Sequence, residues 1–266
     1  MQEVALESAI NSIRVRFGSQ ALTKAAELPP PQPWQSGSPL DRLTGIGGLP
    51  RGRLTLLTGG GTSGKLTLAL DLLARATREF AHAVVIDGGG FDSSSLVPFS
   101  PEQGALRGPR EVKAKPPTSW GYTVVCAPAL EVAGEATAML ARAGAGFLLV
   151  MSDLPEHWLG PIESGANRSG TVVVGVVEAA GRALAHASSF SVAFSRSEWI
   201  WERDLLVGLR TSVRCTKNRV APPLGETDLE VRYPLGPRAI RDYSPGVLEA
   251  PRVDVEEVHT RESAAG

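Results

Sequence analysis

The feature that most constrains this fold is a glycine-rich segment, GGGTSGK, at residues 59–65. It follows the short apolar run RLTLLT and precedes an amphipathic run that extends to about Glu79. A strand, a glycine loop and a helix in this order form a phosphate loop, in which curled backbone amides and a helix N-terminus face phosphate oxygens. The segment therefore predicts a nucleotide-phosphate site in an α/β protein; a glycine-rich turn with an incidental lysine is the alternative.

The composition of the predicted loop already separates phosphate binding from metal binding. Lys65 is expected to reach the β and γ phosphates of ATP. The next position, where a hydroxyl would coordinate Mg²⁺, is Leu66, and the nearest hydroxyl belongs to Thr67. One residue turns a helical side chain by about 100°, so Thr67 does not simply replace it. We expect weak ATP binding with impaired Mg²⁺ coordination. The predicted nucleotide contacts here are Gly59, Gly60, Gly61, Thr62, Ser63, Gly64, Lys65, Leu66 and Thr67.

Apolar, β-branched runs continue through the middle of the chain and alternate with helical patterns. Beyond the strand at residues 53–58, we expect strands near residues 83–87, 123–126, 147–151 and 171–177. Such runs between helices are typical of a mostly parallel sheet that is covered on both faces. After residue 188, apolar and polar residues alternate instead, which predicts an antiparallel extension at one edge. The predicted fold class is α/β.

The pattern of the N-terminal residues predicts an arm outside this core. Residues 3–17 place apolar side chains on one helical face, and residues 28–39 contain prolines that exclude a helix. We expect an N-terminal helix and proline-rich linker at residues 1–39, a core at 40–245 and a flexible acidic tail at 246–266. The N-terminal helix either packs on its own domain or docks on another subunit, and the sequence leaves both open.

Charge and cysteine content exclude several classes of protein. The 27 Lys and Arg against 28 Asp and Glu give a net charge of −1, which excludes a generally basic nucleic-acid coat. Cys126 and Cys215 are too few for a disulfide framework or a zinc site, and no metal site is predicted. No signal-peptide pattern or membrane-length apolar run is present, so we expect a cytoplasmic protein.

Several motifs together resemble the RecA recombinase family over roughly residues 5–240. ALESAINSIRVRFGSQAL resembles its N-terminal oligomerisation helix, and SPLDRLTGIGGLPRGRLTLLTGGGTSGK resembles its approach to the phosphate loop. AVVIDGGGFD resembles the strand that carries the family's catalytic carboxylate, and LARAGAGFLLVMSD resembles its second nucleotide strand. RCTKNRVAPPLGETDLEVRYPLG resembles the segment that closes its core. The resemblance implies a RecA-like phosphate-loop core with an N-terminal helical arm.

The resemblance also implies a set of losses at the nucleotide site. The family's catalytic Glu falls on Gly89, so no general base is expected there. The metal-linked Asp falls on Ser152, with Asp153 one residue later, and the γ-phosphate-sensing Gln falls on Glu178, whose charge would repel phosphate. Together these replacements imply a degenerate DNA-dependent ATPase without catalytic residues, rather than an efficient enzyme.

Other contacts of the family are retained. The resemblance implies nucleotide contacts from Asp92 and Tyr233, although the adenine-stacking Tyr of the family falls on Ser95. It also implies that the basic pair Lys217 and Arg219 acts across a subunit interface on a neighbour's nucleotide.

The two DNA-binding loops of the family are reduced in this chain. The first corresponds to residues 154–170, and the second is nearly absent after Val177. We expect weak, sequence-independent binding of single-stranded DNA that falls with salt. For the basic stretch at residues 107–115, a solvated loop is the alternative. The candidate DNA contacts are Arg107, Arg110, Lys113, Lys115, Trp158, Arg168 and Arg182.

A RecA-like core without catalysis is similar to the accessory proteins of bacterial damage-induced mutagenesis cassettes, the ImuA type. The resemblance implies a role in DNA repair during the SOS response, in translesion synthesis, with polymerase-like protein partners and self-association. The alternative is an ATP-dependent DNA recombinase in which Thr67 and Asp153 supply the missing groups. A small-molecule kinase is disfavoured because the closing segment would have no reason to exist there.

Overall fold

A computed structural model describes residues 7–8, 11–12, 15–16, 32–89, 122–222, 225–233 and 240–242. The chain divides into two units, Met1–Gln32 and Pro33–Gly266. Residues 7–8, 11–12 and 15–16 are helical, and the rest of the predicted helix at 3–17 lies outside the described residues. The predicted tail at 246–266 also lies outside them. No helix of the described part is long and apolar enough to cross a membrane.

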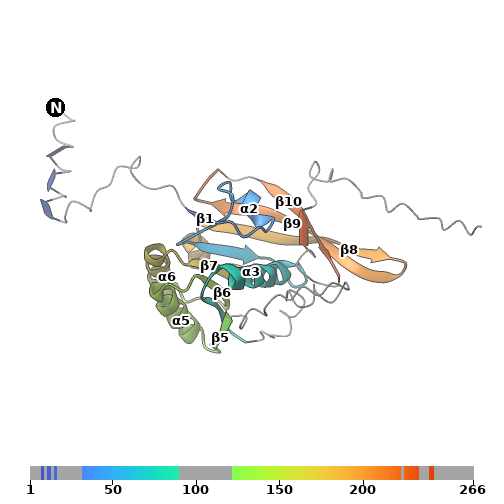
Figure 1. Cartoon of the computed structure of the whole chain (residues 1–266), viewed down its shortest axis with the longest axis horizontal. Coiled ribbons are helices and arrows are strands. Elements are labelled where there is room, and N and C mark those ends of the chain that lie inside the picture. The colour runs from blue at the N-terminus through green and yellow to red at the C-terminus, as the bar shows by residue number, and fades with distance from the viewer. Residues whose placement is uncertain are drawn as a thin grey trace, which may run out of the picture. The chain divides into compact units, whose positions relative to one another are not determined.

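The second unit is built on a nine-stranded sheet, counted over the described residues, with the order β11-β10-β9-β8-β3-β7-β6-β4-β5 (Figure 1). Strands β3 to β7 are parallel to their neighbours, and β8 also joins β3 in parallel. From β8 to β11 the pairing is antiparallel. The predicted α/β class with a mostly parallel sheet and an antiparallel edge is therefore confirmed. The parallel strands are β3 (Leu54–Thr58), β4 (Ala83–Asp87), β5 (Tyr122–Cys126), β6 (Phe147–Met151) and β7 (Val172–Val177).

Helices cover both faces of the parallel strands, as continuous apolar runs require. The helix α3 (Lys65–Glu79) packs on one face, and α5 (Leu130–Ala143) packs on the other with α6 (Glu156–Ser169) and α7 (Arg182–Ala187). Along β6, Leu149 joins the core on the α3 side, whereas Leu148 joins the core on the α5 side. Because the glycine loop joins the end of β3 to α3, and β7 and β8 run parallel to β3, the loop lies at the carboxyl ends of the parallel strands.

The region expected to be a shortened DNA loop, residues 154–170, is instead largely the helix α6. Leu159, Ile162 and Ala166 are buried against α5 and the sheet. Pro161 lies inside this helix and has no N–H to donate, a pattern that favours a loop in the sequence. Burial of one apolar face outweighs that local preference, because most helical stability in proteins comes from such packing.

The core begins at Pro33, earlier than the predicted boundary at residue 40. The two-residue strand β1 (Pro33–Trp34) pairs with β2 (Leu49–Pro50), ahead of and behind the short helix α2 (Leu40–Leu43). Trp34 is 1% exposed, and its ring meets those of Phe80 and Phe147 edge-on at 5.3 Å. Residues 33–39 are therefore part of the folded core and not a linker.

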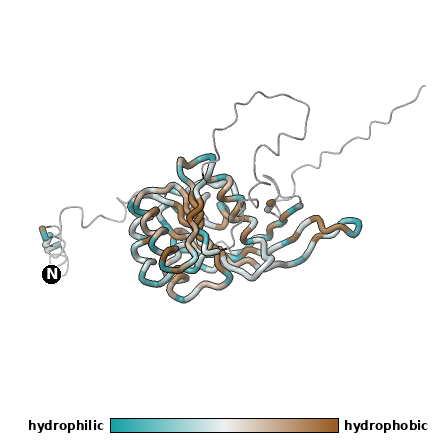
Figure 2. The backbone as a smooth tube through the Cα atoms, turned by 90° about the horizontal axis from the view of Figure 1, so that it is seen from below, coloured by the Kyte–Doolittle hydropathy of each residue, from teal (hydrophilic) through white to brown (hydrophobic). Residues whose placement is uncertain are grey.

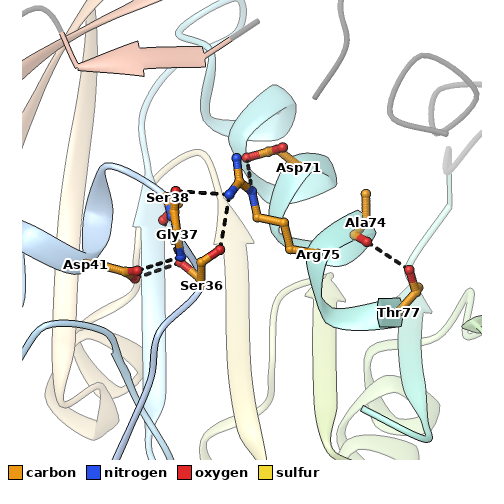
Figure 3. A network of polar contacts seen from close by, with 8 residues as sticks. All are labelled: Ser36, Gly37, Ser38, Asp41, Asp71, Ala74, Arg75 and Thr77. Carbon is orange, nitrogen blue, oxygen red and sulfur yellow. Dashed lines mark hydrogen bonds and ion pairs between the residues drawn. The ribbon is translucent and has the colours of Figure 1, made fainter. Parts of the chain in front are cut away.

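A network of polar contacts fastens this early segment to α3 (Figure 3). Arg75 donates to the backbone oxygens of Ser36 and Gly37 at 3.2 and 3.0 Å, and to the Asp71 carboxylate at 2.8 Å. Asp41 accepts from the Ser36 hydroxyl and the Gly37 amide, each at 2.7 Å. The network ties the helix that follows the glycine loop to the segment before it.

The antiparallel extension includes a long hairpin of β8 (Phe190–Glu202) and β9 (Leu205–Asn218), which projects from the core in Figure 2. Arg203 and Asp204 form its turn with φ angles of 48° and 65°, the left-handed backbone of a tight two-residue connection. One edge of β9 pairs with β10 (Glu226–Arg232), and β10 pairs with β11 (Ile240–Asp242). The exposed apolar side chains near the turn are Trp201, Leu205 and Leu206.

Candidate functional site

The glycine loop has the backbone geometry that a phosphate loop needs. Gly59 has a φ of 146°, and a Cβ built there would lie 2.5 Å from the carbonyl oxygen of Phe194 on β8. Gly64, the residue before α3, has a φ of 85°. Only glycine takes both positions without strain. The turn from β3 into α3 is therefore fixed by the main chain, with the N-terminus of a 15-residue helix at its end.

The side chains of the loop leave polar atoms available to a ligand. The Lys65 ammonium donates to the carbonyl oxygen of Gly60 at 3.1 Å, across the loop. In the described part of the chain, the hydroxyl of Ser63 is buried and has no hydrogen-bond partner. A lysine above the loop, an α-helix N-terminus and curled amides are what nucleotide phosphates require. These residues fit a bound nucleotide.

The same place does not fit a phosphate-bound Mg²⁺ ion. Leu66 is 42% exposed and carries no oxygen, while Thr67 is half-buried one residue further along α3. Directly after strand β6, the hydroxyl of Ser152 donates to the backbone oxygen of Asp153 at 3.0 Å. Among the described residues, no group of three or more His, Cys, Asp and Glu side chains is placed to hold a metal. No step of a reaction is therefore assigned to Mg²⁺.

The end of β4 carries a carboxylate that shapes a turn. Asp87 is buried, and one of its oxygens accepts the amide of Gly89 at 2.9 Å. Gly89 has a φ of 124° and no neighbour within 4 Å of a built Cβ. The position implied for a general base is thus an exposed backbone turn. At the end of β7, the backbone oxygen of Glu178 accepts the amide of Gly59 at 3.0 Å, so that strand end is joined directly to the loop.

Of the other implied nucleotide contacts, Tyr233 and Asp92, only Tyr233 is among the described residues. Tyr233 follows β10, is 37% exposed, and donates its backbone N–H to the oxygen of Val207 at 2.8 Å. Side chains of β9 and β10 approach the loop, since a Cβ at Gly64 would contact those of Leu209 and Thr211 on β9 and of Val231 on β10. Asp92 lies outside the described residues.

Lys217, implied as a contact to a neighbour's nucleotide, is engaged within its own chain. Its ammonium donates to the carbonyl oxygens of Ala185 and His186 at 2.7 and 2.6 Å, which are backbone acceptors of α7. Burial lowers the pKa of Lys217, and the positive charge of Arg219 lowers it further. Sequence reasoning missed this clamp, because a bond to main-chain oxygens far away in the chain leaves no motif.

The candidate DNA contacts are not gathered into one surface by the described residues. Trp158 donates its indole N–H to Glu131 at 2.9 Å, and its ring packs on α5, where a Cβ at Gly134 would lie 2.3 Å away. Arg168 is in the last turn of α6, whereas Arg182 begins α7. Arg107, Arg110, Lys113 and Lys115 lie outside the described residues. Packing on α5 accounts for the place of Trp158, and its contact with DNA remains a prediction.

Comparisons with known proteins agree with the observed fold and loop. Residues 4–93 match a model of the RecA N-terminal domain. The chain is 28% identical over 258 residues to Protein RecA of Aquifex pyrophilus, covering 86% of this chain and 74% of that protein. It is 26% identical over 269 residues to Protein RecA of Ehrlichia chaffeensis, covering 87% of this chain and 72% of that protein. The chain is therefore similar in sequence to RecA proteins over most of its length.

A solved structure extends the agreement in fold. The crystal structure of a KaiC-like protein from the hyperthermophilic archaeon Pyrococcus horikoshii superposes with a TM-score of 0.55 and 18% sequence identity. The match covers 80% of this chain and 100% of that one. At this level of identity the likeness concerns the fold alone.

Proposed function

We propose that this chain is a RecA-like accessory protein of DNA repair, of the type that serves damage-induced mutagenesis and translesion synthesis in the cytoplasm. In this proposal it keeps a nucleotide-binding frame and has impaired hydrolysis. The observation that carries the proposal is the exposed Leu66 directly after a correctly formed glycine loop. Phosphate can still be held by backbone and lysine, while the hydroxyl for the metal is gone.

The neighbouring strand ends support the same proposal. Phosphoryl transfer to water relies on charge stabilisation by a metal and on a group that orients or deprotonates the water. Gly89 supplies no carboxylate, and the Ser152 hydroxyl is bonded to its neighbour's carbonyl. Losses of this kind each cost orders of magnitude in rate, and their effects need not add.

Protein contacts and DNA belong to the proposal as well. Residues 1–32 form a unit of their own, and the apolar face predicted for residues 3–17 suits a second copy or a polymerase-like partner. Removing residues 1–28 should change the oligomeric state or partner capture while the melting temperature of the core stays within a few degrees. Loss of folding on removal would instead assign the segment to its own domain. Single-stranded DNA is proposed as a weak ligand.

The decisive test measures ATP binding and ATP hydrolysis on the same preparation, with and without single-stranded DNA. We expect detectable ATP binding that Lys65→Ala weakens, and turnover far below the usual enzyme range of roughly 1–10³ s⁻¹. Gly89→Glu alone should leave turnover low, because the metal ligands stay absent. Turnover within the usual range in the unmodified chain would overturn the proposal.

A second candidate is an ATP-dependent recombinase that binds single-stranded DNA. It is favoured by the names of the relatives, which are called Protein RecA and match over more than two thirds of their length. It requires Thr67 and Asp153 to hold the metal from shifted positions. Under this candidate, Thr67→Ala and Asp153→Asn should each abolish a DNA-stimulated ATPase, whereas the first proposal predicts no such activity to lose.

A further inference from the structure

The outer part of β8 has one open edge among the described strands. β8 pairs with β3 only from Phe190 to Ala193, because β3 ends at Thr58. From Glu198 to Glu202 it pairs only with β9, along its other edge. This part of the hairpin projects from the core (Figure 1). Every second residue of an edge strand directs its backbone N–H and C=O away from the sheet, where a further strand can bind them.

One face of this edge segment is acidic. Glu198 forms an ion pair with Arg210 of β9. Glu202 forms an ion pair with Arg232, the last residue of β10. Both arginines also contact the carboxylate of Glu230, so Glu198 and Glu202 lie on the same face of the sheet. Each of these two acids keeps more than half of its side-chain surface exposed. The arginines therefore position two carboxylates that a neighbouring strand can still reach.

The opposite face of the same segment is aromatic. Successive residues of a strand point to alternate faces, so Trp199 and Trp201 lie opposite to the acids. The register shift beside them comes from an extra residue on β9, and β8 itself continues without interruption. Trp201 pairs with Leu206 across the hairpin, and these residues are 60% and 40% exposed. Figure 2 shows apolar stretches along the projecting part of the hairpin and a hydrophilic tip.

A strand added at this edge would have to match both faces. A residue beside either acid would be basic, and a residue beside either tryptophan would be apolar, because such cross-strand pairs stabilise a sheet. The two acids are four residues apart and flank the tryptophans. The matching strand therefore reads basic, apolar, any residue, apolar, basic. This pattern is the same in both directions, so it holds for a parallel and for an antiparallel strand.

The two acids disfavour other occupants of the edge. In a symmetric antiparallel pair that sets Trp199 against Trp201 of a second copy, Glu198 and Glu202 would also lie opposite each other. Like charges placed directly opposite are destabilising in a sheet. Bases of a nucleic acid could stack on the tryptophans, but its phosphates would approach the carboxylates and be repelled.

We propose that residues 198–202 of β8 bind an extended, basic and apolar strand of another protein by adding it to the sheet. Main-chain hydrogen bonds along the edge hold the strand, and the tryptophans and acids select its side chains. The ion pairs with β9 and β10 fix the edge before binding, which lowers the entropic cost. The proposal uses no residue of the glycine loop and does not rest on the accessory function proposed above.

The test uses the full chain and a cyclic hairpin peptide, free of tryptophan, whose outer strand reads Lys-Val-Thr-Val-Lys. We expect this lysine peptide to bind and to slow exchange of the outward-facing amides of residues 198–202 at least tenfold, because new hydrogen bonds protect them. Trp201→Ser should weaken binding at least fivefold. Met139→Ser removes an exposed apolar side chain from α5 and should leave binding unchanged. Melting curves would verify that every variant is folded.

Exchanging the charges provides a test that a loss of folding cannot imitate. Glu198→Lys combined with Glu202→Lys should weaken binding of the lysine peptide at least tenfold. The same double variant should bind a peptide that carries Glu-Val-Thr-Val-Glu more tightly than the unmodified chain does. Glu135→Lys makes the same kind of change on the exposed side of α5 and should alter neither affinity by more than twofold.

Several results would overturn the proposal. Absence of binding, or binding that the charge exchange does not reverse, would exclude the predicted strand. Binding without slower exchange at residues 198–202 would exclude strand addition. Slow exchange there in the free chain would assign the edge to a second copy if it rises with protein concentration, and to a segment of the same chain if it does not. Protection by a short oligothymidylate in place of the peptide would assign the surface to nucleic acid.

Discussion

The glycine loop and the strand ends around it differ in the groups that they offer to a nucleotide. The loop begins at Gly59, which lies against the main chain of Phe194 and donates its amide to the backbone oxygen of Glu178, and it ends at Gly64, which has a φ of 85°. The neighbouring positions Gly89, Ser152 and Leu66 offer no carboxylate or free hydroxyl. In the proposed function, phosphate binding rests on the backbone of the loop, whereas hydrolysis would need side chains that these three positions do not supply. Binding and turnover can be lost separately, because they rest on different parts of the chain.

The largest effect that would test this difference is expected at Gly59. Gly59→Ala should lower the free energy of unfolding by about 3 kcal/mol, because the new Cβ meets the Phe194 oxygen and the backbone conformation is strained. Gly60→Ala, where nothing lies within 4 Å of a built Cβ, is the matched control and should cost below about 0.5 kcal/mol. Denaturant unfolding measures both. Equal costs would show that the loop is not held by the main chain.

The next effect concerns the network behind the loop. Arg75→Met should cost about 2 kcal/mol of stability, since it leaves the nearly buried Asp71 carboxylate without its partner. Arg51→Gln removes an exposed pair with Glu79 and should cost below about 0.5 kcal/mol. Thermal and denaturant unfolding compare the two variants. If Arg75→Met lowers the free energy of unfolding as little as the control does, the contacts of Arg75 do not stabilise α3.

Restoring the missing hydroxyl at position 66 tests whether a single side chain limits ATP binding in the presence of Mg²⁺. Leu66→Thr is expected to tighten ATP binding by about 1 kcal/mol, roughly fivefold, and only when Mg²⁺ is present. Leu66→Ala shortens the same side chain without adding a hydroxyl and should bring no gain. Calorimetric titration with and without Mg²⁺ distinguishes them. An identical gain in both variants would contradict a metal role for this position.

The smallest effect is in the dependence of stability on pH. Burial raises the pKa of Asp71 above 3.8, partly offset by Arg75. Between 3.8 and the folded pKa, the folded chain binds more protons than the unfolded chain, so this group's contribution to stability falls as pH rises. The unfolding free energy of the wild type relative to Asp71→Asn should therefore decrease from acid toward neutral pH. An increase over that range would give the opposite sign and contradict the assignment.

Strong local patterns were sufficient to predict much of the fold. The runs at β4 and β6 were located to the residue, because apolar strands bounded by polar turns stand out in sequence. The helix α6 was missed, since Gly160 and Pro161 favour a loop and only tertiary packing explains the helix. The place of Trp34 was missed for a similar reason. A proline-rich neighbourhood suggests a linker, and burial among distant rings has no local signal.

In the candidate site, too, the continuous motif was predicted from the sequence and the contacts between distant residues were not. The loop from Gly59 to Lys65 was recognisable because it is a short continuous motif, and the backbone angles at Gly59 and Gly64 require glycine. The clamp by Lys217 on α7 was not, because its acceptors are main-chain oxygens that any residue could supply. A motif in one continuous stretch can be recognised in the sequence, whereas a clamp between two separate elements can be recognised only in the folded structure.

The turn of the β8–β9 hairpin has a consequence for solubility. Trp201, Leu205 and Leu206 are exposed near the end of a projecting pair of strands, an arrangement prone to joining other strands edge to edge. Glu202, Arg203 and Asp204 stand between them in the chain. Two such tips could stack into a continuous sheet only by dehydrating or pairing these charges, which acts against aggregation. The chain can therefore keep its apolar tip accessible without becoming a seed for intermolecular sheets.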